Sequence, residues 1–335
     1  MIRQNVRRAI NWVRRRLPPP VLPVILMYHR VATPRFDPWE LSVSPARFRE
    51  QMQAIARHRT PVGIDELVHR LDEGSAAGTS VAVTFDDGYL DNFSEAKPVL
   101  EEYQVPATVF ITTTAIDAKG DFWWEELAQM LMSTKRAVQG EMIAGNELVS
   151  IAIPSMDQDG PPRADWNADE PRNERERTYR ILWEKLWHMS PEQRDLCMEQ
   201  LRRICGWSPG VPEGPTMSRE QVIALQSDLV AIGAHARIHH PLPLHEPVRR
   251  RVEIEGSLAD CQSLASVPIT GFAYPHGNLD AETKSMVRSA GYDWACSTHR
   301  AAVDLVRFDR YDLPRLAVGN WSGRKLLKEI GALRP

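Results

Sequence analysis

The sequence lacks the features that define several large classes of protein. Its four cysteines are scattered and include no CxxC pair, which excludes a zinc knuckle and a disulfide framework and favours a reducing compartment. No stretch approaches the roughly 20 apolar residues of a membrane-spanning helix. The longest apolar run near the N-terminus, residues 21–28, is short and interrupted by Pro23, so we expect no secretory signal. These absences predict a cytoplasmic protein.

Acidic residues are also missing from the start of the chain. The first is Asp37, and eight arginines precede it, which leaves 33 basic against 44 acidic residues in 37–335, a net charge of −11. Such an acidic body argues against nucleic acid as the main partner.

Residues 1–17 combine an apolar stripe with arginines on the remaining faces. This pattern predicts a basic amphipathic helix within a separable N-terminal element, residues 1–20, because three prolines follow the stripe. Such a helix could lie peripherally on an anionic membrane, at its inner face. A helix packed on its own domain, or a frayed tail, is the alternative.

The remainder of the sequence contains a repeated strand-then-helix rhythm. Alternating strands and helices predict a parallel sheet, and seven or eight strands favour a closed α/β barrel over an open sheet. The strand candidates are residues 24–28, 60–64 (the weakest), 81–85, 107–111, 229–233, 269–273, 293–297 and 315–318, with helical patterns at 45–58, 64–71, 92–103 and 247–265.

The rhythm breaks between about residues 121 and 217. Residues 154–175 are polar and rich in proline, which is typical of a loop. Two helices are predicted after it, at 173–189 and 191–205. The second begins with Ser190 as its N-cap and a capping-box glutamine three residues later.

This break predicts the organisation of the chain. We expect a first barrel part (21–120), a mostly helical insertion (121–217) and a second barrel part (218–335). The insertion holds six of the ten tryptophans, which we interpret mainly as core residues, although indole rings can also stack on sugars. They are Trp123, Trp124, Trp166, Trp183, Trp187 and Trp207.

The stretch VAVTFDDGYLDNF, residues 81–93, ends a strand candidate in two adjacent carboxylates, Asp86 and Asp87. Asp-Gly alone is a common turn signal, but neighbouring carboxylates repel each other unless a positive charge lies nearby. His235 and His239 follow another strand candidate, and their spacing places both imidazoles on one face of a helical turn. Imidazole nitrogen and carboxylate oxygen are typical ligands of zinc. The pattern predicts a catalytic metal site, with a solvated histidine loop as the alternative.

Polar residues follow four strand candidates in all. His29 closes the first, and Tyr274-Pro275-His276-Gly277 closes another. The carboxyl ends of the strands of an α/β barrel open onto one face, where active sites lie. We therefore expect these clusters to converge in space.

Together these segments resemble the successive motifs of the NodB-type polysaccharide deacetylases, the family-four carbohydrate esterases. The matching stretches are TFDDG at 84–88, HxxxH at 235–239 and FAYPHG at 272–277, with ILMYH at 25–29 and LPR at 313–315 typical of one bacterial branch. The resemblance runs from about residue 24 to residue 318, excluding the insertion. It implies a distorted (β/α) barrel of seven or eight strands, and removal of acetyl groups from N-acetylated sugars with a divalent metal.

The resemblance also implies roles for single residues. Asp87, His235 and His239 would hold the metal, with Zn²⁺ as the expected ion. Asp86 would be the general base that takes a proton from the attacking water, which requires an ionised carboxylate within hydrogen-bond reach.

Further groups would act on the substrate or the oxyanion. A backbone N–H near His276 would bind the oxyanion, and we also place Tyr274, Pro275 and Arg315 in this group. The usual late Leu-x-His motif is absent, since residues 321–335 contain no histidine. His29, which matches an N-terminal histidine of relatives with permuted motifs, is therefore the expected general acid.

Two other departures from the family pattern concern the surroundings of the site. Ala236 stands where the family usually has Ser or Thr, so a hydrogen bond that orients the histidines is expected to be lost. Ala273 replaces a frequent arginine, which leaves Asp86 without that partner unless Arg315 supplies it.

The expected function is N-deacetylation of an amino sugar in a polysaccharide, an oligosaccharide or a lipid-linked glycan, as in exopolysaccharide or cell-envelope biosynthesis. O-deacetylation would use the same metal and base and stays open. A carbohydrate-binding pseudoenzyme is the alternative from another class, and the retained Asp86, Asp87, His235 and His239 argue against it.

Overall fold

The computed structural model describes residues 21–335 except 146 and 161–165. The amphipathic helix predicted over residues 1–17 lies outside the described residues. Within the described part, none of the helices combines the length and apolar character needed to cross a membrane.

An eight-stranded sheet forms the centre of the larger part of the molecule, and its strand pairs are parallel. Its order is β10-β1-β3-β4-β7-β8-β9, with β2 beside β3. The chain before β10 pairs with β9 through Leu313 and Cys296, so the sheet curls back on itself as a distorted barrel. The strands are β1 (Val24–Tyr28), β2 (Thr60–Pro61), β3 (Ser80–Phe85), β4 (Ala107–Ile111), β7 (Val230–Ala234), β8 (Gly271–Ala273), β9 (Trp294–Cys296) and β10 (Leu316–Ala317). The predicted α/β barrel is confirmed.

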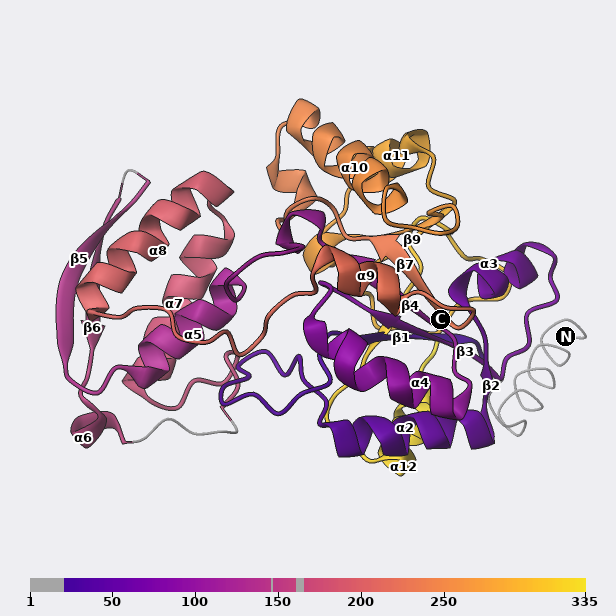
Figure 1. Ribbon diagram of the computed structural model, residues 1–335, viewed down its shortest axis with the longest axis horizontal. Helices are drawn as coiled ribbons and strands as arrows, with labels where there is room; N and C mark the ends of the chain where they lie inside the picture. The colour runs from indigo at the N-terminus through magenta and orange to yellow at the C-terminus, as the bar shows by residue number, and fades with distance from the viewer. Residues whose placement is uncertain (1–20, 146, 161–165) are drawn as a thin grey trace, which may run out of the picture.

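Helices cover the outside of the barrel (Figure 1). Because both faces of the sheet are covered, β1, β3 and β4 are buried along their whole length, as their continuous apolar runs predict. The covering helices are α2 (Pro45–His58), α3 (Ile64–Asp72), α4 (Lys97–Tyr103), α9 (Arg219–Leu225), α10 (Pro247–Gln262), α11 (Ala281–Ala290) and α12 (Gly323–Ala332). The helix expected over 92–103 begins instead with a π-helical turn, Asn92–Ala96, a form that is frequent near functional sites.

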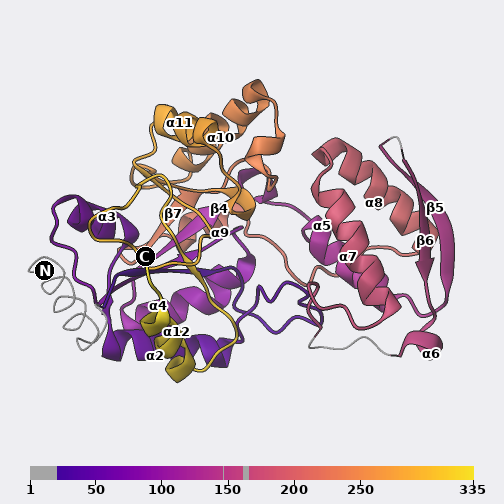
Figure 2. The same ribbon diagram turned by 180° about the vertical axis from the view of Figure 1, so that it is seen from behind.

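A second body, built from the segment between the barrel parts, stands beside the barrel in both views (Figures 1 and 2). It has a core of its own that includes Leu127, Tyr179 and Leu201. Its elements are α5 (Trp123–Ser133), the antiparallel hairpin β5 (Val138–Ala144) and β6 (Glu147–Ile153), α6 (Met156–Asp159), α7 (Glu174–Trp187) and α8 (Pro191–Cys205). The capping box at Ser190 is confirmed. The hairpin was not predicted, so "mostly helical" describes the segment incompletely.

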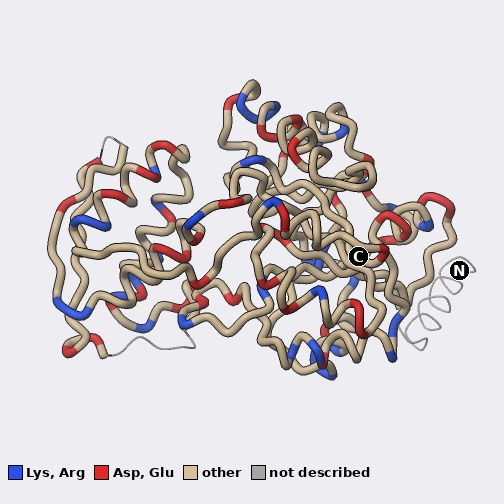
Figure 3. The backbone as a smooth tube through the Cα atoms, viewed as in Figure 1, with Lys and Arg blue, Asp and Glu red and all other residues tan. Residues whose placement is uncertain are grey.

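Acidic and basic residues are interspersed along both bodies (Figure 3).

We keep residues 121–217 as the proposed limits of the insertion.

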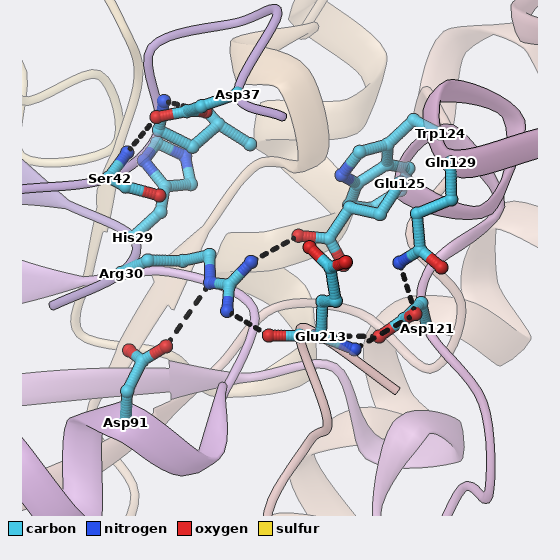
Figure 4. Close-up of polar contacts among 12 residues, drawn as sticks. His29, Arg30, Asp37, Ser42, Asp91, Asp121, Trp124, Glu125, Gln129 and Glu213 are labelled. Carbon is cyan, nitrogen blue, oxygen red and sulfur yellow. Dashed lines mark hydrogen bonds and ion pairs between the residues drawn. The ribbon is translucent and has the colours of Figure 1, made fainter. Parts of the chain in front are cut away.

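A partly buried polar network joins the two bodies (Figure 4). Arg30, which follows β1 closely, lies between Asp91 and Glu125, at 3.1 and 2.9 Å from their carboxylate oxygens. Its third nitrogen donates to the backbone oxygen of Glu213 at 2.6 Å. Asp121 accepts the Glu213 N–H at 3.2 Å. The network therefore links the loop after β1 to both segments that connect the insertion to the barrel.

The burial of Glu125 predicts a pH dependence of stability. Burial raises the pKa of Glu125 to about 8, because the attraction of Arg30 does not offset desolvation and Asp121 raises the pKa further. The folded state thus holds this proton more tightly than the unfolded chain, whose glutamate titrates near its ordinary pKa of 4.5. The free energy of unfolding is therefore expected to fall as the pH rises from about 4.5 to about 8, and this contribution levels off above that window.

Urea denaturation of wild-type protein and Glu125→Gln at several pH values measures this contribution. The substituted amide keeps the shape of the side chain but does not titrate, so the variant should lose much of the fall between pH 5 and pH 8. Glu50→Gln changes an exposed carboxylate and should retain the wild-type profile. A Glu125→Gln profile parallel to wild type would contradict the assignment.

Candidate active site

Side chains that follow four strands of the barrel line one cavity. His29 follows β1, Asp86 and Asp87 follow β3, His235 follows β7, and His276 follows β8. The strand register explains their proximity, because Tyr28 pairs with Phe85 and the Asp86 N–H donates to the Tyr28 oxygen at 3.0 Å. The expected convergence on one face is therefore present.

Asp87, His235 and His239 form a compact cluster. The Asp87 Oδ1 lies 3.4 Å from His235 Nε2 and 3.2 Å from His239 Nε2, and one possible ligand atom from each residue lies within 4.8 Å of the others. The same Oδ1 is buried and accepts no hydrogen bond within the described part of the chain. A buried, orphaned carboxylate oxygen that faces two imidazole nitrogens fits a divalent cation.

The two histidines lie on an irregular loop, so the helical turn expected around them is wrong. Ala236, between them, has a φ of +58°. His235 Nδ1 donates to the Ala273 carbonyl at 2.7 Å, which leaves Nε2 facing Asp87 and fixes the ring in the way that carboxylates and carbonyls orient metal-binding histidines. Burial lowers the pKa of His239, which favours the neutral imidazole that a metal requires.

Left-handed backbone is concentrated at this site. Asp87, Ala236 and His276 have φ values of +75°, +58° and +56°, and Gly88 continues the turn after Asp87 with a φ of +83°. A non-glycine residue in this conformation costs on the order of 1–3 kcal/mol and persists only where the surrounding structure enforces it. With this backbone, Asp87 Oδ1 faces the Nε2 atoms of His235 and His239.

Asp86 is held by Arg315. The guanidinium forms two hydrogen bonds of 2.7 Å, one to each carboxylate oxygen, and both side chains are almost fully buried. Burial alone would raise the pKa of Asp86, but Arg315 and then His235 outweigh it and lower the pKa to about 2. The carboxylate is therefore ionised, and Arg315 is its charged partner.

The structure places the other predicted residues as follows. His29 and His276 line the cavity. Tyr274 does not, because it lies in the barrel core and its hydroxyl donates to the Tyr311 oxygen at 3.0 Å, while its N–H donates to the Cys296 oxygen at 3.2 Å. Tyr274 is thus a core residue rather than a substrate contact. Pro275 has no N–H and does not line the cavity either, so of this motif only His276 stays a candidate oxyanion donor.

The cavity has a volume of about 500 Å³ and a second wall that the sequence did not predict. Trp39 and Leu41 come from the loop after β1, and the remainder of this wall comes from the insertion. The insertion residues are Trp124, Arg180, Trp183, Glu184, Trp187 and His188. Their spacing within the predicted helix 173–189 was a usable signal, since Trp183 and Trp187 stand four residues apart on one helical face.

Comparisons with known proteins relate part of this chain to the polysaccharide deacetylases. Residues 73–137 match the family model described as polysaccharide deacetylase. YxkH of Bacillus subtilis (strain 168), named as a candidate polysaccharide deacetylase, is 29% identical over 108 residues. That match spans 32% of this chain and 37% of YxkH, about a third of each.

Among solved structures, the Streptococcus pyogenes deacetylase PplD, in complex with acetate, is similar with a TM-score of 0.58 and 16% identity, over 93% of this chain and 99% of that chain. IcaB from Ammonifex degensii is similar with a TM-score of 0.57 and 16% identity, over 93% of this chain and 97% of that chain. At these identities the likeness shows that the fold is shared.

Proposed function

We propose that this chain, whose barrel is that of the NodB-type polysaccharide deacetylases, is a metal-dependent hydrolase that removes the N-acetyl group of an amino sugar in a glycan. The observation that carries the proposal is the Asp87–His235–His239 cluster beside Asp86, a carboxylate kept ionised by Arg315. The family match over residues 73–137, which contains Asp86 and Asp87, supports it.

Asp87, His235 and His239 would hold the cation, which we propose to be zinc because two imidazoles and one carboxylate are a typical set for catalytic zinc. A cation bound there would lower the pKa of a water molecule and polarise the acetyl carbonyl.

The chain's own groups would move the protons. An Asp86 carboxylate oxygen would accept a proton from the attacking water, and Arg315, bonded to both oxygens, fixes the orientation of that carboxylate. The N–H of His276 would stabilise the negative charge on the acetyl oxygen. His29, which follows β1 as Asp86 follows the neighbouring β3, would donate a proton from its imidazole to the departing amine.

Acetate release from N-acetylglucosamine oligomers by chelator-treated protein, titrated with zinc, tests the proposal. Release is expected to appear with about one equivalent of zinc, since the cluster offers one site of three ligands. If zinc binds but acetate is released only from O-acetylated sugars, the bond that is cleaved would be an ester and not the proposed amide. Absence of zinc binding would overturn the metal site and the mechanism with it.

A further inference from the structure

We infer that helix α7 of the insertion forms the sugar-binding wall of the cavity. In this arrangement a pyranose ring stacks on Trp183 and Trp187, and Arg180 and Glu184 form hydrogen bonds with its hydroxyl groups. The inference rests on the proposed function and names its ligand as a short N-acetylated glycan.

The first step is the division of α7 into two faces. Tyr179, Leu182 and Leu186 are buried in the core of the insertion. Arg180, Trp183, Glu184 and Trp187 follow one another at spacings of three, one and three, so they share the neighbouring face. These four residues line the cavity together with Asp86, Asp87 and the histidines. One side of α7 therefore stabilises the insertion, and the other completes the site.

The second step is the continuity of the aromatic surface. The rings of Trp39 and Trp183 lie 4.3 Å apart, and those of Trp183 and Trp187 are stacked at 6.1 Å. The Trp187 ring centroid in turn lies 5.6 Å from that of His276, which is beside His239 of the Asp87–His235–His239 cluster. Trp183 and Trp187 are only partly buried. Aromatic faces thus lead from the edge of the cavity to its catalytic end, and such a surface suits the C–H face of a sugar ring.

The third step is the set of polar groups beside these rings. The Arg180 guanidinium lies over the rings of Trp39 and Trp183, at 5.5 and 5.6 Å. Its Nε is 3.7 Å from an Asp169 carboxylate oxygen, and the Arg180 side chain is 32% exposed. The Glu184 side chain is exposed, and no hydrogen bond or ion pair engages its carboxylate among the described residues.

These polar groups distinguish between ligands. An acyl chain or another apolar ligand would remove the Glu184 carboxylate and the exposed part of the Arg180 guanidinium from water without offering hydrogen bonds in return, and each uncompensated buried group is costly. A sugar presents an apolar ring face and hydroxyl groups at its edge, so it can satisfy the rings and the polar groups together. The wall therefore favours carbohydrate over lipid.

Trp187→Ala in the full-length, zinc-loaded protein tests the inference with two acetylated substrates. The KM for the N-acetylglucosamine dimer is expected to rise about 10-fold, which corresponds to about 1.4 kcal/mol of lost stacking. The rate on 4-nitrophenyl acetate, which has no sugar, is expected to fall less than kcat/KM for the dimer, because this ester makes no stacking contact with the wall. Equal losses on both substrates, or an unchanged KM for the dimer, would overturn the inference.

Trp207→Ala is the matched control. Trp207 is also partly buried against the core of the insertion but does not line the cavity. Trp207→Ala should lower the melting temperature as much as Trp187→Ala does and leave the KM for the dimer unchanged. Glu184→Gln, at an exposed position, tests the same wall without a folding risk and should raise the KM about threefold.

Failure of the proposed function would be recognised separately. If wild-type protein releases no acetate from the dimer, deacetylation of this substrate fails, but calorimetric binding of the dimer still tests the wall. If Trp187→Ala weakens this binding about 10-fold and Trp207→Ala leaves it unchanged, the sugar-binding wall would be supported without the proposed deacetylation. Absence of binding by the wild-type protein would overturn it.

Discussion

Asp86→Asn is expected to lower kcat for acetate release by about 100- to 10,000-fold while zinc binding persists. Asp87→Asn, a chemically identical change at the next residue, is expected to weaken zinc binding by about 100-fold or more, since even groups that only orient metal ligands are worth 10- to 100-fold. The Asp86 oxygens face Arg315, whereas Asp87 Oδ1 faces His235 and His239. Calorimetric zinc titration and kcat at saturating zinc measure the two effects independently.

A control is needed because Asp86→Asn also leaves the Arg315 guanidinium buried opposite a neutral amide. Asp91→Asn is a comparable change elsewhere, since Asp91 is a partly buried partner of Arg30 in the junction network, where Arg30 keeps Glu125 as a second partner. Both variants should lower the melting temperature, and only Asp86→Asn should lower kcat at a temperature where both are folded. Wild-type kcat in Asp86→Asn would exclude it as the general base, and undiminished zinc affinity in Asp87→Asn would exclude that ligand.

The barrel was predictable because its strands are read from continuous apolar runs. Strands buried on both faces have no alternating polar side, and β1 and β4 begin and end where their runs do. The hairpin was missed for the opposite reason. In β5 only Met142 and Ala144 are buried, and Gly140 allows Ile204 to approach so closely that an added Cβ would lie 2.8 Å from it. A strand with so few buried side chains leaves little signal in the sequence.

The reacting end of the site was predictable because its residues lie in short stretches at strand ends. Two other features depend on the folded chain. Arg315 and Asp86 are 229 positions apart, so the sequence could offer Arg315 as a partner but could not establish the contact. The tryptophan wall depends on how the insertion packs against the loop that carries Trp39, and no local pattern encodes that packing. Tyr274 was misplaced because a motif does not say which of its side chains turns into the core.

Arg315→Met is expected to lower the free energy of unfolding by about 3–5 kcal/mol, the usual cost of removing one partner of a buried ion pair. The Arg315 and Asp86 side chains are 0% and 3% exposed, so water cannot replace the lost guanidinium. Burial would then raise the pKa of Asp86, and the variant should lose both stability and the ionised base. Urea denaturation measures the loss. Arg49→Met, which breaks an exposed pair with Glu102, should leave the transition nearly unchanged.

The double variant Asp86→Leu/Arg315→Met separates the two consequences of that loss. It leaves no unpaired charge in the interior, and replacement of a buried ion pair by apolar side chains of similar size is often neutral or stabilising. It should therefore be more stable than Arg315→Met alone, yet release no acetate. That result would mean that the buried pair is retained because it keeps a carboxylate ionised at the site, and not because it stabilises the barrel. A double variant no more stable than the single one would instead make the pair part of the packing of the fold.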